Sequence, residues 1–155
     1  MKKGIFAVTL MTLLLAACGG EKPADETSTP EQTVAPAEEI AAVAEITIEA
    51  NDQMKYNLER IDVKEGQTVR ITLKNVGTLA KDVMGHNWIL VKPGTDKDAF
   101  ATAAMAAKAA DYIPAGFEES IIAHTGLTGG GETVTIEFPA PAKGFYSFFC
   151  SFPGH

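Results

Sequence analysis

Two residues that bind transition metals stand close together near the end of the chain. Cys150 and His155 are separated by four residues, and the Phe-Pro-Gly between them fits a tight turn. Thiolate sulfur and imidazole nitrogen are good ligands for copper and zinc. A Cys-x4-His pair alone is weak evidence for a metal site, since a buried, inert cysteine is common in protein cores.

A third donor strengthens the metal hypothesis. His86 stands just before an apolar run that resembles a strand, whereas Cys150 ends another such run. One cysteine and two histidines form the trigonal ligand set of blue-copper electron-transfer sites. His86 could also be a surface histidine after a turn. The combined pattern nevertheless favours a copper site with one thiolate and two imidazoles.

Four longer strings are distinctive: Asn51-Asp52-Gln53-Met54, Val83-Met84-Gly85-His86-Asn87-Trp88, Ile122-Ala123-His124-Thr125 and Phe148-Phe149-Cys150-Ser151-Phe152-Pro153-Gly154-His155. These strings resemble azurins, which are bacterial cupredoxins. The resemblance runs from about residue 45 to the end of the chain, in the family's order. It implies an all-β, Greek-key sandwich or barrel of the cupredoxin type with one inserted α-helix. It also implies one copper ion that cycles between Cu(I) and Cu(II).

The resemblance assigns roles to residues of the site. His86, Cys150 and His155 would bind the metal, and the carbonyl oxygen of Gly85 would approach it weakly along an axis. A glycine is consistent with close backbone approach, because it has no Cβ. Azurins also match His124, but not as a ligand, so we expect that side chain to be exposed or hydrogen-bonded.

The resemblance also implies a surrounding shell and a partner surface. Asn87 would tie the two ligand loops together near the sulfur, although a generic turn asparagine is the alternative. Phe152 would lie beside the ligands. An apolar patch would surround His155. The alternative is that its members are ordinary apolar residues of turns. A small apolar patch suits weak protein–protein encounters that bury less than about 1,200 Å². Its members are Met54, Leu79, Val83, Met84, Phe152 and Pro153.

Redox proteins such as c-type cytochromes or copper reductases are the partners that the resemblance implies for a monomeric electron carrier. The formal net charge of −7 argues against nucleic acid, which requires a basic footprint. No nucleophile–base–acid set is present, so we expect a carrier and not an enzyme. Copper storage or delivery, and non-redox surface recognition on the same fold, remain the alternative functions.

The chain begins with a targeting segment. Lys2 and Lys3 precede an apolar run over residues 5–15, and small residues lead to Cys18. This pattern predicts a lipoprotein signal peptide over residues 1–17 and lipidation of Cys18, which would anchor the protein to the inner or outer membrane and face it to the periplasm. An ordinary secretory signal is the alternative.

Residues 18–44 have the composition of a tether. They are rich in alanine, proline, threonine and glutamate without an apolar period, which predicts an extended, disordered segment ahead of a domain at residues 45–155. A short alanine-rich helix at residues 38–44 is the alternative. The chain has two cysteines, Cys18 and Cys150. A disulfide between them would prevent lipidation of Cys18 and metal binding by Cys150, so we expect none. Azurins typically carry an N-terminal disulfide, for which this chain lacks the cysteines.

Alternating apolar and polar residues predict strands at residues 45–49 and 68–74. Further strands are predicted at 87–92, 120–124, 132–138 and 145–150, with a hairpin loop at the glycines 129–131. An alanine-rich stretch predicts a helix over residues 98–111. We expect Trp88 to lie in the core.

One departure from azurins concerns the end of the sequence. Azurins have a methionine a few residues beyond the second histidine, followed by a final strand, whereas this sequence stops at His155. A sheet edge without its closing strand is exposed, and the weak axial sulfur of a blue copper site would be missing. We therefore expect the chain to be C-terminally truncated, with the last strand and the axial methionine beyond His155.

Overall fold

A computed structural model describes residues 43–155. The predicted signal peptide, the predicted lipidation site at Cys18 and the tether up to residue 42 lie outside the described residues. Within residues 43–155, no helix has the length and apolar character needed to cross a membrane.

The first sheet has four strands in the order β2-β1-β3-β6. They are β1 (Val43–Asn51), β2 (Lys55–Tyr56), β3 (Thr68–Asn75) and β6 (Thr133–Pro139). β1 and β3 run parallel, and β2 and β6 are antiparallel to their neighbours. In β3, Val69, Ile71 and Leu73 are buried while their neighbours are more exposed, because alternate side chains of a strand point to opposite faces.

The second sheet has three antiparallel strands in the order β5-β4-β7. They are β4 (Ile89–Val91), β5 (Ile121–His124) and β7 (Ser147–Phe149). The central strand β4 is buried throughout, since Leu90 faces one apolar cluster while Ile89 and Val91 face another. The two sheets form a sandwich and do not close into a barrel within the described residues.

Two apolar clusters lie on the two faces of the second sheet. The first fills the space between the sheets and contains Trp88, which is 1% exposed, as predicted. The rings of Phe138 and Phe148 lie 5.8 Å from the Trp88 ring. The second cluster lies on the other face of the second sheet. It contains Phe100, whose ring packs edge-on against Phe149 with 5.2 Å between the ring centroids.

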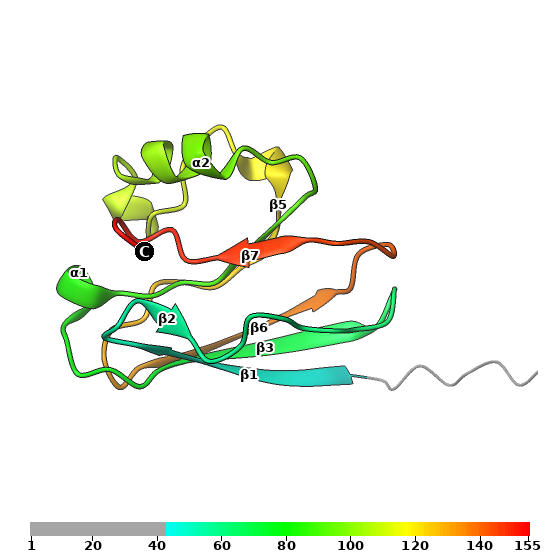
Figure 1. The fold of residues 1–155 in the computed structure, drawn as a ribbon, viewed down its shortest axis with the longest axis horizontal. Helices are drawn as coiled ribbons and strands as arrows, with labels where there is room; N and C mark the ends of the chain where they lie inside the picture. The colour runs from blue at the N-terminus through cyan, green and yellow to red at the C-terminus, as the bar shows by residue number, and fades with distance from the viewer. Residues whose placement is uncertain (1–42) are drawn as a thin grey trace, which may run out of the picture. The chain divides into compact units, whose positions relative to one another are not determined.

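Helical segments connect the strands, and α2 (Lys97–Ala104) covers the outer face of the second sheet (Figure 1). Its first turn is capped by Asp96, whose carboxylate accepts hydrogen bonds from the N–H groups of Asp98 and Ala99. The others are short: α1 (Lys81–Met84) and the 3₁₀ turns η1 (Lys108–Ala110) and η2 (Glu118–Ser120).

The helix predicted over residues 98–111 is therefore too long. α2 buries Phe100 and Ala104, whereas Met105 is 60% exposed and none of residues 105–111 is buried. Without that packing, a short helix gains little from alanine alone. After Ala104, backbone hydrogen bonds join residues three apart, as in a 3₁₀ turn. Asp111 and Tyr112 then adopt positive φ.

One other expectation is corrected, and two short elements were missed. The loop with Gly129 and Gly130 is not a hairpin, because β5 and β6, which it joins, belong to different sheets. Its glycines pack against backbone, since a Cβ on Gly130 would lie 2.8 Å from the carbonyl oxygen of Gly77. The short elements β2 and α1 were not predicted, because two to four residues show no period.

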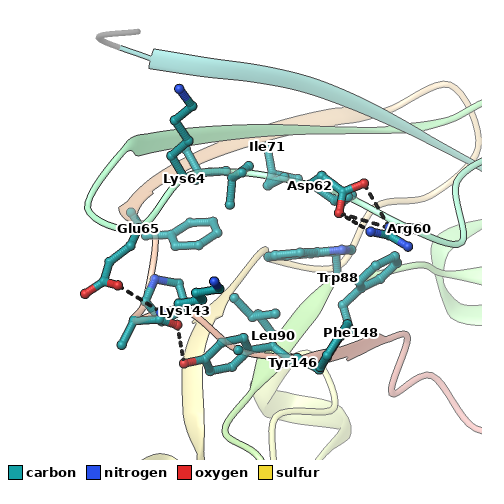
Figure 2. Close-up of a pocket in the computed structure, with 18 of the residues that line it drawn as sticks. Arg60, Asp62, Lys64, Glu65, Ile71, Trp88, Leu90, Lys143, Tyr146 and Phe148 are labelled. Atoms are coloured by element: carbon teal, nitrogen blue, oxygen red, sulfur yellow. Dashed lines mark hydrogen bonds and ion pairs between the residues drawn. The ribbon is translucent and has the colours of Figure 1, made fainter. Parts of the chain in front are cut away.

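A groove of about 670 Å³ opens between the sheets beside Trp88 (Figure 2). Its walls combine the segment at residues 59–65 with the loop at residues 141–146. Trp88 Nε1 is buried and has no hydrogen-bond partner in the described part of the chain. In the loop at residues 141–146, the Tyr146 hydroxyl donates a hydrogen bond of 2.8 Å to the Ala142 carbonyl oxygen.

Candidate metal centre

His86, Cys150 and His155 converge at one place. One donor atom from each side chain lies within 4.8 Å of the other two. The Nδ1 atom of His155 is 3.3 Å from Cys150 Sγ, and the centroids of the two imidazole rings are 4.5 Å apart. His86, which lies 64 positions before Cys150 and 69 before His155, thus joins them in one compact cluster of two nitrogens and a sulfur.

The position of His86 is fixed through both its backbone and its ring. Its N–H donates to Thr128 O at 2.9 Å, and its own carbonyl accepts from the N–H and hydroxyl of Thr128 at 2.7 and 2.8 Å. The ring atom Nε2 lies 3.0 Å from the carbonyl oxygen of Asn51. A carbonyl can only accept, so Nε2 carries the proton and Nδ1 keeps a lone pair for a metal.

Gly85 precedes this histidine in a crowded position. A Cβ added to Gly85 would lie 2.5 Å from the carbonyl oxygen of Lys81 and 2.9 Å from Leu127 Cγ. Its φ of −76° is available to any residue, so close packing and not backbone conformation requires glycine here. The absent side chain leaves room for the carbonyl of Lys81, at the start of α1, and for the side chain of Leu127.

The second loop begins where β7 ends and returns His155 to Cys150 through a tight turn. The N–H of His155 donates to Phe152 O at 3.2 Å, and Gly154 has a φ of +94°. Proline followed by a glycine with positive φ is typical of a type II turn. The ring of Phe152, which is 8% exposed, lies 5.0 Å from the His155 ring and supports it from the interior.

Asn87 joins the two loops. Its Oδ1 accepts from the Ser151 N–H at 2.9 Å, and its Nδ2 donates to Ser151 Oγ at 2.8 Å. Nδ2 also donates to Asp111 O at 2.8 Å, and Ser151 Oγ donates to Tyr112 O at 2.7 Å. Asn87 is fully buried and Ser151 is 4% exposed, so water does not compete for these bonds.

Burial keeps the metal-free donors close to neutral. It raises the pKa of the Cys150 thiol, against the opposing effects of the Asn87 and Phe152 N–H groups and the Tyr56 hydroxyl. Burial also lowers the pKa of His86. The pKa of His155 falls to about 4, through burial and then through the nearby His86. Neutral imidazoles are the form that binds a metal.

The cluster fits copper by its chemistry. A thiolate supplies the soft donor that Cu(I) prefers, and two imidazole nitrogens suit both common oxidation states. Cys150 is a free cysteine, so its sulfur is available. His86 Nδ1 is available as well, since the Asn51 carbonyl occupies the other ring nitrogen.

The other predicted residues have varied environments. Met54, Leu79 and Val83 are 50%, 40% and 57% exposed, Pro153 is exposed and Met84 is partly buried. Phe152 is buried, so it backs His155 and adds little exposed surface. His124 is exposed, and its Nδ1 lies 3.1 Å from the Thr125 carbonyl oxygen.

Sequence reasoning missed three residues that contact the cluster's loops: Tyr56, Asp111 and Thr128. Each acts through a contact with a residue at least 24 positions away, which leaves no local pattern to find. Tyr56 lies two residues after the string at residues 51–54 that resembles azurins. Its closeness to that string in the sequence was the one signal that could have identified it.

A two-sheet sandwich with one cysteine and two histidines gathered in adjacent loops defines a cupredoxin. The sequence matches the family described as "Copper binding proteins, plastocyanin/azurin family" over residues 42–155. The chain therefore belongs to this family of copper-binding proteins. It is a blue copper protein that transfers single electrons, and by its family it is an electron carrier.

Azurins are among the similar proteins. Azurin from Achromobacter denitrificans is 46% identical over 122 residues, which cover 75% of this chain and 80% of that protein. Azurin from Alcaligenes faecalis is 45% identical over 116 residues, which cover 72% and 89%. The crystal structure of dithionite-reduced auracyanin from Roseiflexus castenholzii is similar with a TM-score of 0.62 at 34% identity, covering 74% of this chain and 87% of that one.

Replacement of Asn87 should destabilise the fold. In Asn87→Ala three hydrogen bonds are lost, two of them buried and one partly buried, and we expect the free energy of unfolding to fall by about 3 kcal/mol in a urea titration of metal-free protein. Asn57→Ala is the matched control, because Asn57 Oδ1 accepts one exposed bond, from the Glu49 N–H. Equal losses in the two variants would contradict the role of Asn87 in joining the loops.

The metal-free protein should lose stability as the pH falls from about 6.5 to about 4. The unfolded chain protonates His155 near its ordinary pKa of about 6.5, whereas the folded chain resists protonation down to about 4, so acid favours unfolding in this window. His86 acts in the same direction. Thermal melts of His155→Gln should show a weaker pH dependence than wild type, and parallel curves would argue against the lowered pKa.

Proposed function

We propose that Nδ1 of His86, Sγ of Cys150 and Nδ1 of His155 bind one copper ion. Gly85, which directly precedes His86, would contribute its carbonyl oxygen as a further, weak donor to the ion. The observation that carries this proposal is the convergence of the three donors within 4.8 Å, with His86 Nε2 held separately by the Asn51 carbonyl. Both loops reach this arrangement through contacts within the protein alone.

Copper held at this site supplies one-electron chemistry by cycling between Cu(I) and Cu(II). The chain's contribution is to hold the donors in one arrangement for both states. His86 is fixed by the Thr128 backbone bonds, and Cys150 is followed by Ser151, whose N–H and hydroxyl are bound. Donors held by such supporting contacts need little rearrangement when an electron arrives or leaves.

Electrons would enter and leave through the exposed edge of His155. Of the three donor residues, His155 is the exposed one, whereas His86 is 1% exposed. Exposed apolar side chains of Met54, Leu79, Val83 and Pro153 would form the surrounding contact patch, with Met84 and Phe152 behind it. A small apolar patch suits brief encounters with redox proteins such as c-type cytochromes or copper reductases, and the carrier would act as a monomer.

The carrier would work in the bacterial cell envelope, on the periplasmic side of the inner or outer membrane. Lipidation of Cys18 would anchor the protein, and the segment up to residue 42, just before β1, would let the copper domain reach partners at a distance. The basis is the sequence Leu15-Ala16-Ala17-Cys18 after a short apolar run, together with the acidic, proline-containing stretch that follows.

Replacement of the thiolate should abolish the blue colour. Cys150→Ser exchanges a soft, strongly donating sulfur for a hard oxygen that usually stays protonated. We expect the copper-loaded variant to lack the intense visible charge-transfer band of the wild type. Ser147→Ala, on the exposed face of β7, is the control and should keep the band. An intense band in Cys150→Ser would remove the sulfur from the ligand set.

Replacement of Cys18 should release the protein from membranes. In the bacterial host, wild-type protein should incorporate a fatty-acid analogue and partition into detergent, whereas Cys18→Ala should do neither. The same comparison with Cys18→Ser tests for a requirement for the sulfur atom. Unlabelled wild-type protein in the soluble periplasmic fraction would favour the ordinary secretory signal.

A further inference from the structure

Asn75 is a buried polar residue at the last position of β3. Its side chain is 2% exposed, although it belongs neither to the donor cluster nor to the strings that resemble azurins. Its main chain is fully bonded, since its N–H donates to Glu132 O at 2.9 Å and its carbonyl accepts from the Gly131 N–H at 2.8 Å. A carboxamide buried to this degree needs hydrogen-bond partners of its own.

The Asn75 carboxamide has partners at both of its ends. Its Oδ1 accepts from the N–H of Gly77 at 3.0 Å. Its Nδ2 donates to Thr128 O at 3.1 Å and, at the longer distance of 3.4 Å, to Met84 O. An N–H can only donate and a carbonyl can only accept, so these partners fix which end is which. The nitrogen end therefore faces the loop that carries His86.

The two carbonyls that Asn75 binds lie on either side of the His86 backbone. Thr128 O is the same atom that accepts the His86 N–H, at 2.9 Å. The peptide between Gly85 and His86 is trans, so its carbonyl points opposite to its N–H. With the N–H directed at Thr128, the Gly85 carbonyl points away from Thr128. The position of Thr128 O thus sets both the place of His86 and the direction of the Gly85 carbonyl.

We propose that Asn75 is a positioning residue for the metal centre, which fixes the peptide between Gly85 and His86. This inference rests on the proposed roles of these two residues as donors to copper. The observation that carries it is that one atom, Thr128 O, accepts both the Asn75 side-chain N–H and the His86 N–H. Without Asn75, the bridge between His86 and Thr128 would lose this direct tie to β3.

A simpler role for Asn75 is to close the turn at the end of β3. An asparagine oxygen bound to the N–H two residues later is a common turn contact. The turn is tight, because a Cβ on Gly77 would lie 2.1 Å from Asp52 Oδ1. This role needs the oxygen of Asn75 alone. The two roles are separable with Asn75→Ser, because a serine hydroxyl can also accept from that N–H but is too short to bind Thr128 O and Met84 O.

The first measurement is amide hydrogen exchange in metal-free protein. In Asn75→Ser, exchange of the His86 N–H should accelerate by about tenfold or more relative to the amides in the middle of β3, because the loop opens locally. Leu73→Val is the matched control, since Leu73 is fully buried on the same face of β3 and carries no polar group. There the His86 amide and the β3 amides should change alike, because lost packing acts on the whole sheet.

The second measurement is a Cu(II) titration of the same proteins. Residues that hold metal ligands in place typically affect affinity strongly, so the dissociation constant for Cu(II) should rise by about tenfold or more in Asn75→Ser. In Leu73→Val it should stay within about threefold of the wild-type value, because the polar contacts of the His86 loop remain. A role in the turn alone predicts that Asn75→Ser behaves like Leu73→Val in both measurements.

Both effects are required. If either the faster exchange at His86 or the weaker Cu(II) binding is no larger in Asn75→Ser than in Leu73→Val, the proposal is overturned. Should Asn75→Ser fail to fold, Asn75→Thr takes its place with the same expectations, because its branched side chain favours a strand and also lacks the reach. Wild-type protein that binds Cu(II) without a thiolate charge-transfer band would overturn the proposed function, and this inference with it. The exchange comparison involves no copper, so the two failures are distinguishable.

Discussion

The paired hydrogen bonds between Asn87 and Ser151 hold together two loops that the sequence separates by more than sixty residues. One loop carries His86 and the other carries Cys150 and His155, so the distance between donors depends on this link. Both partners are buried, and an unpaired group there would cost about 1–3 kcal/mol. Further bonds to the carbonyls of Asp111 and Tyr112 extend the link to the segment that follows α2 and η1. The site is therefore organised by the polypeptide before any metal binds.

The two apolar clusters explain why these loops meet at all. β4 follows the His86 loop and β7 precedes the Cys150 loop, and the two strands are hydrogen-bonded neighbours in one sheet. Leu90 and Phe148 anchor this sheet to the first cluster, whereas Ile89 and Phe149 anchor it to the second. With both faces covered, a shift of either strand by one residue would move each side chain into the other cluster, whose packing it does not match. The register Ile89 to Phe149 thus fixes the ends of the strands, and with them the ligand loops.

The sequence predicted the features that depend on local pattern. Alternation marked β1 and β3, and the residue types of His86, Cys150 and His155 identified the donor cluster, while the resemblance to azurins added Gly85 and Asn87. Prediction from the sequence failed where the packing of side chains decides the structure. Alanine content favoured a helix to residue 111, but α2 ends once Phe100 and Ala104 are buried. Tyr56 and Thr128 were missed, because a two-residue strand has no period and an isolated bridge to His86 depends on chain segments distant in sequence.

The most direct test of the account is a crystal structure of the copper-loaded protein in both oxidation states. We expect one copper ion bonded to Nδ1 of His86, Sγ of Cys150 and Nδ1 of His155, with His86 Nε2 still at the Asn51 carbonyl. The hydrogen bonds between Asn87 and Ser151 should keep the same partners in the oxidised and reduced crystals. Copper bound through His86 Nε2, copper at other residues, or loss of the Asn87–Ser151 bonds on metal binding would contradict a site organised in advance by the protein.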